Sequence, residues 1–139
     1  MNTKEIITTR VLVIAGVKIS SGVKRRPRIR IAGFWLKNFG FTDGTLVTGE
    51  FEEGRAILRA VGSGVETYSK FIGAIRKNGG QITQVKDSIL NKKMTPHFEM
   101  TGLWLTRYGF NIGDVIVIYC HHGLIEVIRL DIPNARGFR

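Results

Sequence analysis

The sequence predicts a mainly β fold that consists of two similar units joined by one α-helix. Three observations lead to this prediction. One motif occurs twice in the chain, two stretches have the pattern of apolar β-hairpins, and one stretch between the copies has the spacing of an amphipathic helix. Because neither unit can cover its own apolar hairpin, we expect the two units to bury each other.

The repeat is gapless. Residues 27–44 and 96–113 share the frame P-x5-G-x-W-L-x3-G-F-x2-G, and both tryptophans of the chain occupy the same repeat position. A comparison of 27–59 with 96–128 gives eight identities: Pro27/Pro96, Gly33/Gly102, Trp35/Trp104, Leu36/Leu105, Gly40/Gly109, Phe41/Phe110, Gly44/Gly113 and Gly54/Gly123. Matches of Gly, Trp and Pro in one register indicate an internal duplication.

Each unit is expected to begin with two strands. Residues 12–16 and 81–85 lie at the same offset as the motif, which predicts an upstream strand in each copy, and the apolar run 11–17 favours a buried one. In the next strand, isoleucines at 29 and 31 alternate with Arg28 and Arg30, so one face is expected to be wet.

A short helix and a hairpin complete each unit. Residues 34–39 suffice for about a turn and a half of helix, and Gly40 supplies the left-handed residue that ends it. The hairpin strands are predicted at 45–51 with 55–61, and at 114–120 with 124–130, with Gly closing each loop at positive φ. The second hairpin is apolar on both faces, which requires cover on both sides.

The stretch 65–77 is predicted to be a connecting helix packed on the core. Its apolar residues Val65, Tyr68, Ile72 and Ile75 form one helical stripe, and the glycines that follow end it. The expected organisation is a first unit at 8–62, a helix at 63–79 and a second unit at 80–132.

The repeated frame followed by a hairpin resembles the SymE toxin-like domain of the AbrB/MazE/SpoVT superfamily of swapped-hairpin proteins, over roughly 27–59 and 96–130. The resemblance implies two interleaved units that form a small barrel, here as a pseudo-dimer within one chain. It also implies that basic residues on the N-terminal strands and loops contact DNA. SymE-like proteins are regarded as toxins of type I toxin–antitoxin loci, with toxicity connected to RNA cleavage and to nucleoid binding.

The chain departs from that family in three ways. It carries two copies where relatives usually carry one. The acidic residue after the third glycine is Asp114 in the second copy but Thr45 in the first. Gly49 stands where the second copy has Ile118, which predicts a looser or bulged first hairpin.

Charge favours a polyanionic partner. The chain has 21 Lys and Arg against 11 Asp and Glu, a net charge of +10. The excess lies in 1–33 and 65–95, before each repeated motif. The candidate nucleic-acid-binding residues are Lys18, Lys24, Arg25, Arg26, Arg28 and Arg30, expected to form a near-continuous cationic edge, together with Lys92 and Lys93. We expect contacts to backbone phosphates, because no element demands base readout; a charge that serves only solubility is the alternative.

The residues for catalysis are few. Cys120, His121 and His122 share one hairpin turn, but neighbours on a strand point to opposite faces, so we predict neither a metal site nor a cofactor. Histidine can serve as a general acid or base in a metal-free ribonuclease, which leaves His97, His121 and His122 as open candidates with no identified partner. Catalytic residues, and whether the protein is an enzyme, stay open.

These observations predict a cytoplasmic protein, with association with the nucleoid as an alternative location. The single cysteine excludes an intrachain disulfide, and no apolar run reaches the length of a membrane span. The predicted function is a nucleic-acid-binding SymE-like toxin or nucleoid-binding protein, with DNA ahead of RNA as partner and no membrane. An endoribonuclease toxin and an AbrB/MazE-like antitoxin or transcription regulator are the alternatives, and a homodimer or a protein partner stays open.

Overall fold

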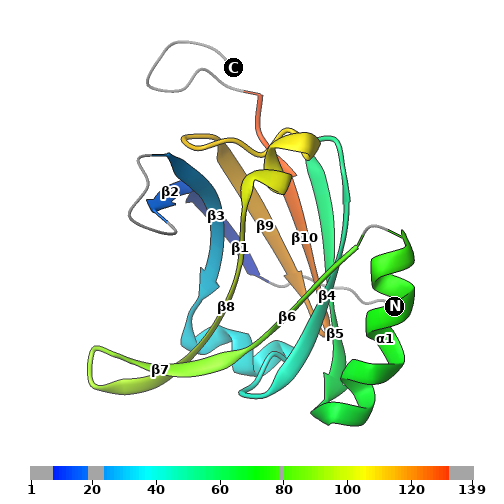
Figure 1. Cartoon of the computed structure of the whole chain (residues 1–139). Coiled ribbons are helices and arrows are strands. Elements are labelled where there is room, and N and C mark those ends of the chain that lie inside the picture. The colour runs from blue at the N-terminus through cyan, green and yellow to red at the C-terminus, as the bar shows by residue number, and fades with distance from the viewer. Residues whose placement is uncertain (1–7, 19–23, 79, 132–139) are drawn as a thin grey trace, which may run out of the picture.

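The computed structural model describes residues 8–18, 24–78 and 80–131, so the expected boundaries at 79 and 132 lie outside the described residues. Within these ranges the chain is mainly β, with two antiparallel sheets packed around one core (Figure 1). The strands are β1 (Thr8–Val13), β2 (Ala15–Lys18), β3 (Arg25–Ala32), β4 (Thr45–Glu52), β5 (Arg55–Ser63), β6 (Gln81–Gln84), β7 (Lys86–Leu90), β8 (Lys93–Thr101), β9 (Val115–His121) and β10 (Leu124–Arg129). The helices are η1 (Phe34–Phe39), α1 (Gly64–Asn78) and η2 (Leu103–Tyr108), of which η1 and η2 are 3₁₀-helices.

The two sheets do not close into a barrel, contrary to the expectation from the resemblance. One sheet has six strands in the order β1-β9-β10-β5-β4-β6, and the other has four in the order β2-β3-β8-β7. At two corners, Ile14 and Val85, the chain passes from an edge strand of the six-stranded sheet to an edge strand of the four-stranded sheet. At these corners the two sheets are joined by the chain itself and not by hydrogen bonds between paired strands. Each corner is held by the other unit. Ile14 exchanges backbone hydrogen bonds of 2.9 Å with Gly113 and Asp114, and Val85 exchanges bonds of 2.8 Å with Gly44 and Thr45.

The strands of the two copies pair with each other, and at the centre of each sheet equivalent residues lie opposite one another. β1 pairs with β9 and β6 pairs with β4, so the first strand of each copy joins the hairpin of the other. In the four-stranded sheet β3 pairs with β8, and Arg30 lies opposite Glu99, its own counterpart in the repeat. In the six-stranded sheet Ile57 lies opposite its counterpart Glu126. If each strand is replaced by its equivalent in the other copy, the strand order of each sheet becomes its own reverse. The two copies therefore occupy equivalent places in both sheets.

The upstream strands correspond at a different offset from the one expected. The corner residues Ile14 and Val85 are equivalent by their hydrogen bonds, which places them 71 positions apart, whereas Pro27 and Pro96 are 69 apart. The difference of two residues lies in the connection between the upstream strand and β3 or β8.

The repeated motif builds the ends of the core. Leu36, Leu105, Phe41 and Phe110 are fully buried, while the tryptophans pack partly buried against the same cluster. Gly40 ends η1 in the left-handed conformation at φ 89°, and the next amide donates to the Leu36 carbonyl at 3.1 Å. The predicted helix stop is thus confirmed, and η2 ends in the same way.

The hairpins are confirmed, with one correction. Gly54 and Gly123 close their loops at φ 71° and 73°. Gly49 causes no bulge, because it stays in register opposite Leu58; the irregularity of β4 lies between Thr45 and Val47. A side chain at Gly49 would meet Phe51, Met100 and Leu58, which fill the space beside it.

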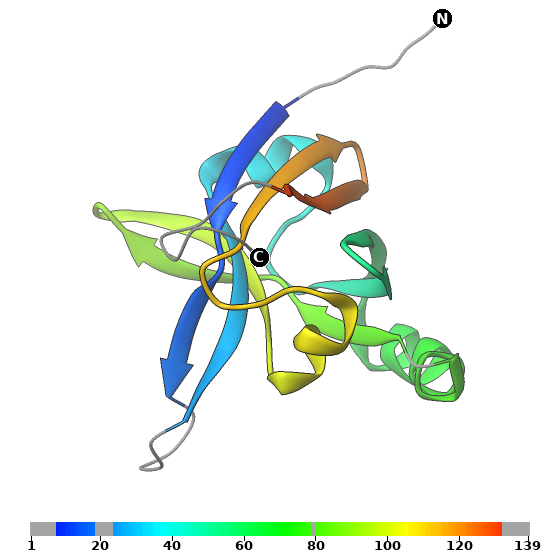
Figure 2. The same cartoon turned by 90° about the horizontal axis from the view of Figure 1, so that it is seen from above.

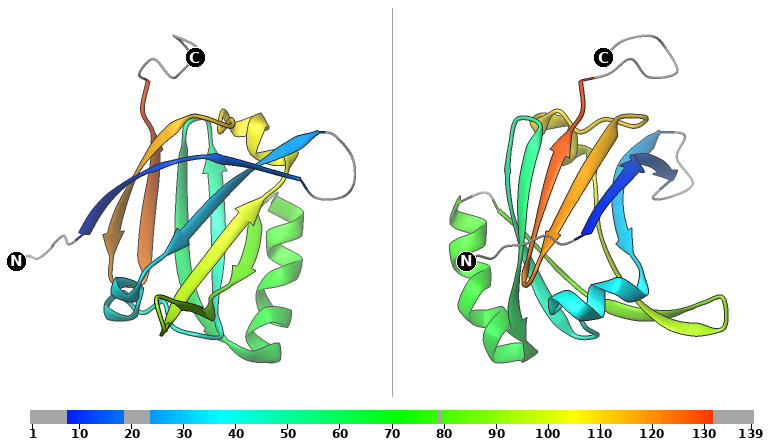
Figure 3. Two further views of the ribbon diagram at one scale, coloured as in Figure 1. Left: turned by 90° about the vertical axis from the view of Figure 1, so that its left-hand side faces the viewer. Right: turned by 180° about the vertical axis from the view of Figure 1, so that it is seen from behind.

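α1 packs on the outer face of the six-stranded sheet, along β4, β5 and β6, rather than on the central core (Figure 3). Val65, at its first turn, is 81% exposed, so the predicted apolar stripe is wrong at that end. The upstream strand is also less buried than expected. Val11 and Val13 are 62% and 64% exposed because they alternate with Leu12, which packs against the core, and so point away from it; the corner residue Ile14 is fully buried.

Candidate nucleic-acid interface

Charge is divided unequally between the two sheets. The strands and described loop residues of the four-stranded sheet carry nine basic and two acidic residues, whereas the six-stranded sheet with its hairpin loops carries four of each. The eight predicted residues all lie in the strands or the described loop residues of the four-stranded sheet. The positive charge of the described strands is therefore concentrated on one of the two sheets.

The centre of this sheet presents arginines outwards. Pro27, Ile29 and Ile31 of β3 point into the core, so Arg26, Arg28 and Arg30 alternate to the outer face; we call these three arginines the central basic face. Glu99 on β8 faces them, with its Oε1 at 3.7 Å from Arg30 Nη1 and 3.9 Å from Arg28 Nη1. The Arg28 Nε atom is buried and has no acceptor among the described residues.

The other predicted residues lie on two hairpins at opposite ends of the sheet. Arm 1, formed by β2 and β3, carries exposed Lys18, Lys24 and Arg25, and arm 2, formed by β7 and β8, carries exposed Lys92 and Lys93. Both hairpins extend beyond the body of the fold (Figure 2). Because β3 and β8 are antiparallel, roughly 35 Å of strand separates the two arms. The expected near-continuous cationic edge is thus three patches: two arms and a central basic face.

A surface hollow of about 370 Å³ lies on the same side of the molecule, between β3, β8 and the corner of the second unit. Its lining includes Arg28, Arg30, Lys86, His97 and Glu99. His97 is half-buried, and its Nδ1 lies 3.2 Å from the Ser88 hydroxyl on β7. Neither Lys86 nor Glu99 stands out in the sequence as a residue of this site. Because side chains alternate along a strand, Glu99 lies on the same face of β8 as His97, and Lys86 lies on that face because it is paired with His97. The position of Lys86 can be deduced only when the register of β7 against β8 is known.

The histidine and cysteine candidates do not meet in one site. Cys120 is fully buried in the core, and burial raises the pKa of its thiol to about 12. His121 ends β9 and His122 lies in the following loop, in the six-stranded sheet, whereas His97 belongs to the four-stranded sheet. No three His, Cys, Asp or Glu side chains among the residues of the described ranges are grouped as a metal site would require.

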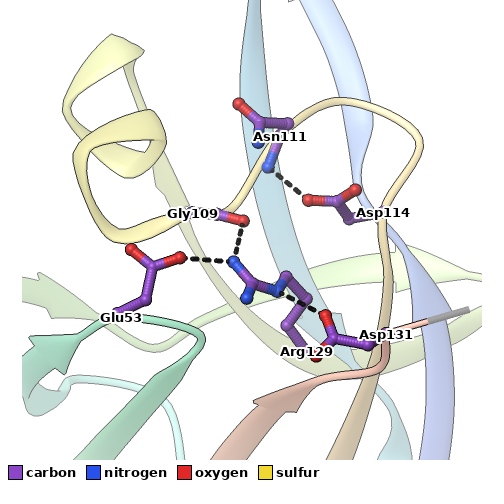
Figure 4. Close-up of polar contacts among 6 residues, drawn as sticks. All are labelled: Glu53, Gly109, Asn111, Asp114, Arg129 and Asp131. Atoms are coloured by element: carbon purple, nitrogen blue, oxygen red, sulfur yellow. Dashed lines mark hydrogen bonds and ion pairs between the residues drawn. The ribbon is translucent and has the colours of Figure 1, made fainter. Parts of the chain in front are cut away.

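A polar cluster at the end of the six-stranded sheet is structural. Arg129 Nη1 donates to Glu53 at 2.7 Å and to the Gly109 carbonyl at 2.9 Å, and its Nε lies 3.5 Å from Asp131 (Figure 4). Glu53 raises the pKa of the Arg129 guanidinium through its hydrogen bond. The cluster connects the loop of the first hairpin to the turn after η2. Its charged groups bind one another and so serve the fold.

The departure at Thr45 and Asp114 has a structural explanation. Asp114 Oδ2 accepts from the Asn111 amide at 2.8 Å, and the Thr45 hydroxyl accepts from the Thr42 amide at 3.3 Å in the equivalent turn. Either side chain therefore closes the same turn. The substitution of Thr for Asp preserves the turn.

Comparison of the chain with known protein families, with curated proteins and with solved structures gives no significant match. None of the helices in the described part of the chain is long and apolar enough to span a lipid bilayer.

Proposed function

We propose that this protein binds nucleic acid, with DNA ahead of RNA, through the phosphate backbone along the four-stranded sheet. The observation that carries the proposal is the unequal charge: nine basic against two acidic residues on one sheet, and an even balance on the other. A charge that serves only solubility would have no reason to favour one sheet.

The geometry favours an extended ligand. Arm 1, the central basic face and arm 2 follow one another over roughly 35 Å, which is close to one helical turn of B-DNA. Arginines can hold phosphates with two parallel hydrogen bonds, and the lysines of the arms act as point charges. In this role the protein is a SymE-like toxin or nucleoid-binding protein of the cytoplasm, whose effect follows from coating or condensing DNA.

We further propose that the chain is a pseudo-dimer of swapped-hairpin units within one polypeptide. The support is the strand pairing: β1 joins the hairpin of the second copy and β6 joins the hairpin of the first. The central pairs Arg30–Glu99 and Ile57–Glu126 each join repeat equivalents, as residues on a two-fold axis would.

The test is fluorescence anisotropy with a random-sequence duplex and a single-stranded RNA of equal length, at several salt concentrations. The variant Lys24→Glu/Arg25→Glu/Arg26→Glu reverses charge on arm 1 and at the edge of the central basic face. Its matched control, Arg59→Glu/Lys70→Glu/Arg107→Glu, makes the same change at exposed residues outside the four-stranded sheet. We expect tight binding with a steep salt slope in the wild type, lost in the first variant and largely kept in the control. Equal losses in both variants, or no binding at low salt, would refute the proposal.

A second function, endoribonuclease, is favoured by the hollow that gathers His97, Glu99, Arg28, Arg30 and Lys86. Cleavage of RNA needs a base to remove the 2′-hydroxyl proton, an acid to protonate the departing 5′-oxygen, and cations to stabilise the phosphorane. His97 and Glu99 lie two residues apart on one face of β8 and offer the acid–base pair.

This second function is tested with His97→Gln, beside His121→Gln as a control of the same chemistry in the other sheet. A ribonuclease would lose cleavage of a labelled RNA in His97→Gln while keeping its RNA affinity, and would be unaffected in His121→Gln. Absence of cleavage by the purified wild type, or equal cleavage by both variants, would leave binding as the function.

A further inference from the structure

The two arms differ in chemistry at equivalent positions. The last described pair of arm 1 is Lys18 opposite Arg25, and its counterpart in arm 2, by the offsets that the structure gives, is Ile89 opposite Met94. One arm therefore carries two cations where the other carries two apolar side chains. The duplication has produced two arms of the same geometry with different surfaces.

The apolar side chains of arm 2 are exposed. Ile89 is 74% accessible, Leu90 and Met94 are each 51%, and Phe34 at the start of η1 is 57%. These four account for nearly half of the large exposed apolar residues in the described ranges; three of them lie on arm 2, and Phe34 lies beside Lys93 of the same arm, so we call them the apolar cluster.

Lysines surround this apolar cluster. The Nζ atoms of Lys37 and Lys93 lie 4.5 and 5.9 Å from the centre of the Phe34 ring. The tip of the hairpin is Asn91–Lys92, at φ 53° and 66°, a left-handed conformation that a lysine rarely adopts. The turn thus holds a cation at the extreme end of the arm, where glycine would be the less strained choice.

Resting on the proposed function, we infer that arm 2 inserts Ile89 and Met94 between base steps of duplex DNA and so kinks it. Ile, Met, Leu and Phe are the side chains that proteins use as wedges in a base stack, and the surrounding lysines complement the phosphates on either side. By register Ile89 and Met94 lie on the face of Pro96 and not on that of Glu99, so they open the stack while Lys92, Lys93 and Lys37 beside them hold the backbone. Arm 2 belongs to the sheet that carries the basic excess, which favours nucleic acid over an apolar protein partner as its occupant.

The test uses the full chain and a duplex of about 30 base pairs labelled with a fluorescence-energy-transfer pair at its ends, together with a duplex that contains 2-aminopurine. The variant is Ile89→Ser/Met94→Ser. The matched control is Val11→Ser/Val13→Ser, which makes two apolar-to-polar changes of similar exposure on the edge of the six-stranded sheet. Both variants change exposed side chains, so both are expected to fold.

At saturation the wild type and the control should bring the duplex ends closer and increase 2-aminopurine fluorescence. The arm 2 variant should bind within about threefold of the wild type, because the phosphate contacts supply most of the affinity, but should leave the duplex straight and stacked. Wild-type binding without bending or unstacking would overturn the inference and leave the proposed function intact, whereas no duplex binding at all would refute both. Wild-type binding to phosphatidylglycerol vesicles that the arm 2 variant loses, with bound DNA unbent, would overturn the inference in favour of a lipid surface.

Discussion

Replacement of Glu99 by Gln should strengthen DNA binding. Glu99 is the only acidic residue on the outward face of the described four-stranded sheet, and its carboxylate lies within 4 Å of both Arg28 and Arg30. A phosphate that binds these arginines must compete with this carboxylate and approach its negative charge. Glutamine keeps the size of the side chain and removes both effects.

The expected gain is modest because the ion pairs are partly exposed. Glu99 is 41% exposed and its arginine partners 32% and 40%, and pairs of this kind contribute about 0.2–1 kcal/mol. Repulsion between the carboxylate and a phosphate roughly 6 Å away adds about 0.7 kcal/mol in water. Together they predict a gain of about 1 kcal/mol, which is about fivefold in Kd. One more neutralised phosphate would also steepen the salt slope by roughly 0.9.

The assay is a salt titration of duplex binding by the wild type, Glu99→Gln and the control Glu50→Gln, which removes the same charge from β4 in the six-stranded sheet. If long-range charge alone mattered, the two variants would bind alike. Equal or weaker binding by Glu99→Gln would refute the central basic face as the phosphate site. The same variant separates the two functions, since a ribonuclease that uses Glu99 would bind RNA more tightly and cleave it more slowly.

Three further predictions concern the fold and the arms. Gly109→Ala should lower the free energy of unfolding by roughly 2–4 kcal/mol in urea titrations, because a Cβ there overlaps the Arg129 guanidinium at a left-handed φ of 81°. Gly113→Ala, at φ 91° with open space around it, should cost only about 1–2 kcal/mol, and equal losses would contradict the overlap. Cys120 should resist iodoacetamide at pH 8 until the protein unfolds. Burial raises the pKa of the Cys120 thiol to about 12, so the thiol contributes to stability fully below about pH 9 and loses this contribution as the pH rises toward 12. Rapid labelling of the native protein would contradict the burial of Cys120. Lys92→Gly should stabilise the turn by up to about 1 kcal/mol and reduce the DNA salt slope by roughly 0.9, and an unchanged slope would remove Lys92 from the interface.

The motif and its local consequences could be predicted because they depend on short-range chemistry. Gly40 ends η1, Gly54 and Gly123 close the hairpins, and each requires positive φ, which glycine alone adopts without strain. The failures come from tertiary context. An apolar run such as 11–17 does not reveal whether its strand lies at the edge of a sheet, and Val11 and Val13 proved exposed. The corner at Ile14, where the chain passes from one sheet to the other, depends on hydrogen bonds to residues about 100 positions away.

The candidate site was predicted in composition but not in shape. Counting charge along the chain identified Arg28, Arg30 and the residues of both arms, because clustered basic residues are visible in the sequence. It could not predict that antiparallel pairing of β3 with β8 would place the arms at opposite ends and bring Glu99 beside Arg30. Those facts require the register, and a register becomes known only when the partner strand is known.

The duplication itself offers a physical reason for divergence. In a homodimer, the residue on the two-fold axis of a strand pair faces its own copy, and two arginines or two glutamates directly opposite each other would repel. One chain with two copies can place Arg30 opposite Glu99 and Ile57 opposite Glu126, which no symmetric pair of identical units allows. Once the halves need not be identical, the arms are free to differ as well. In the proposed pseudo-dimer, the unlike residues at the centre of each strand pair and the unlike chemistry of the two arms have one explanation, the presence of both units in one polypeptide.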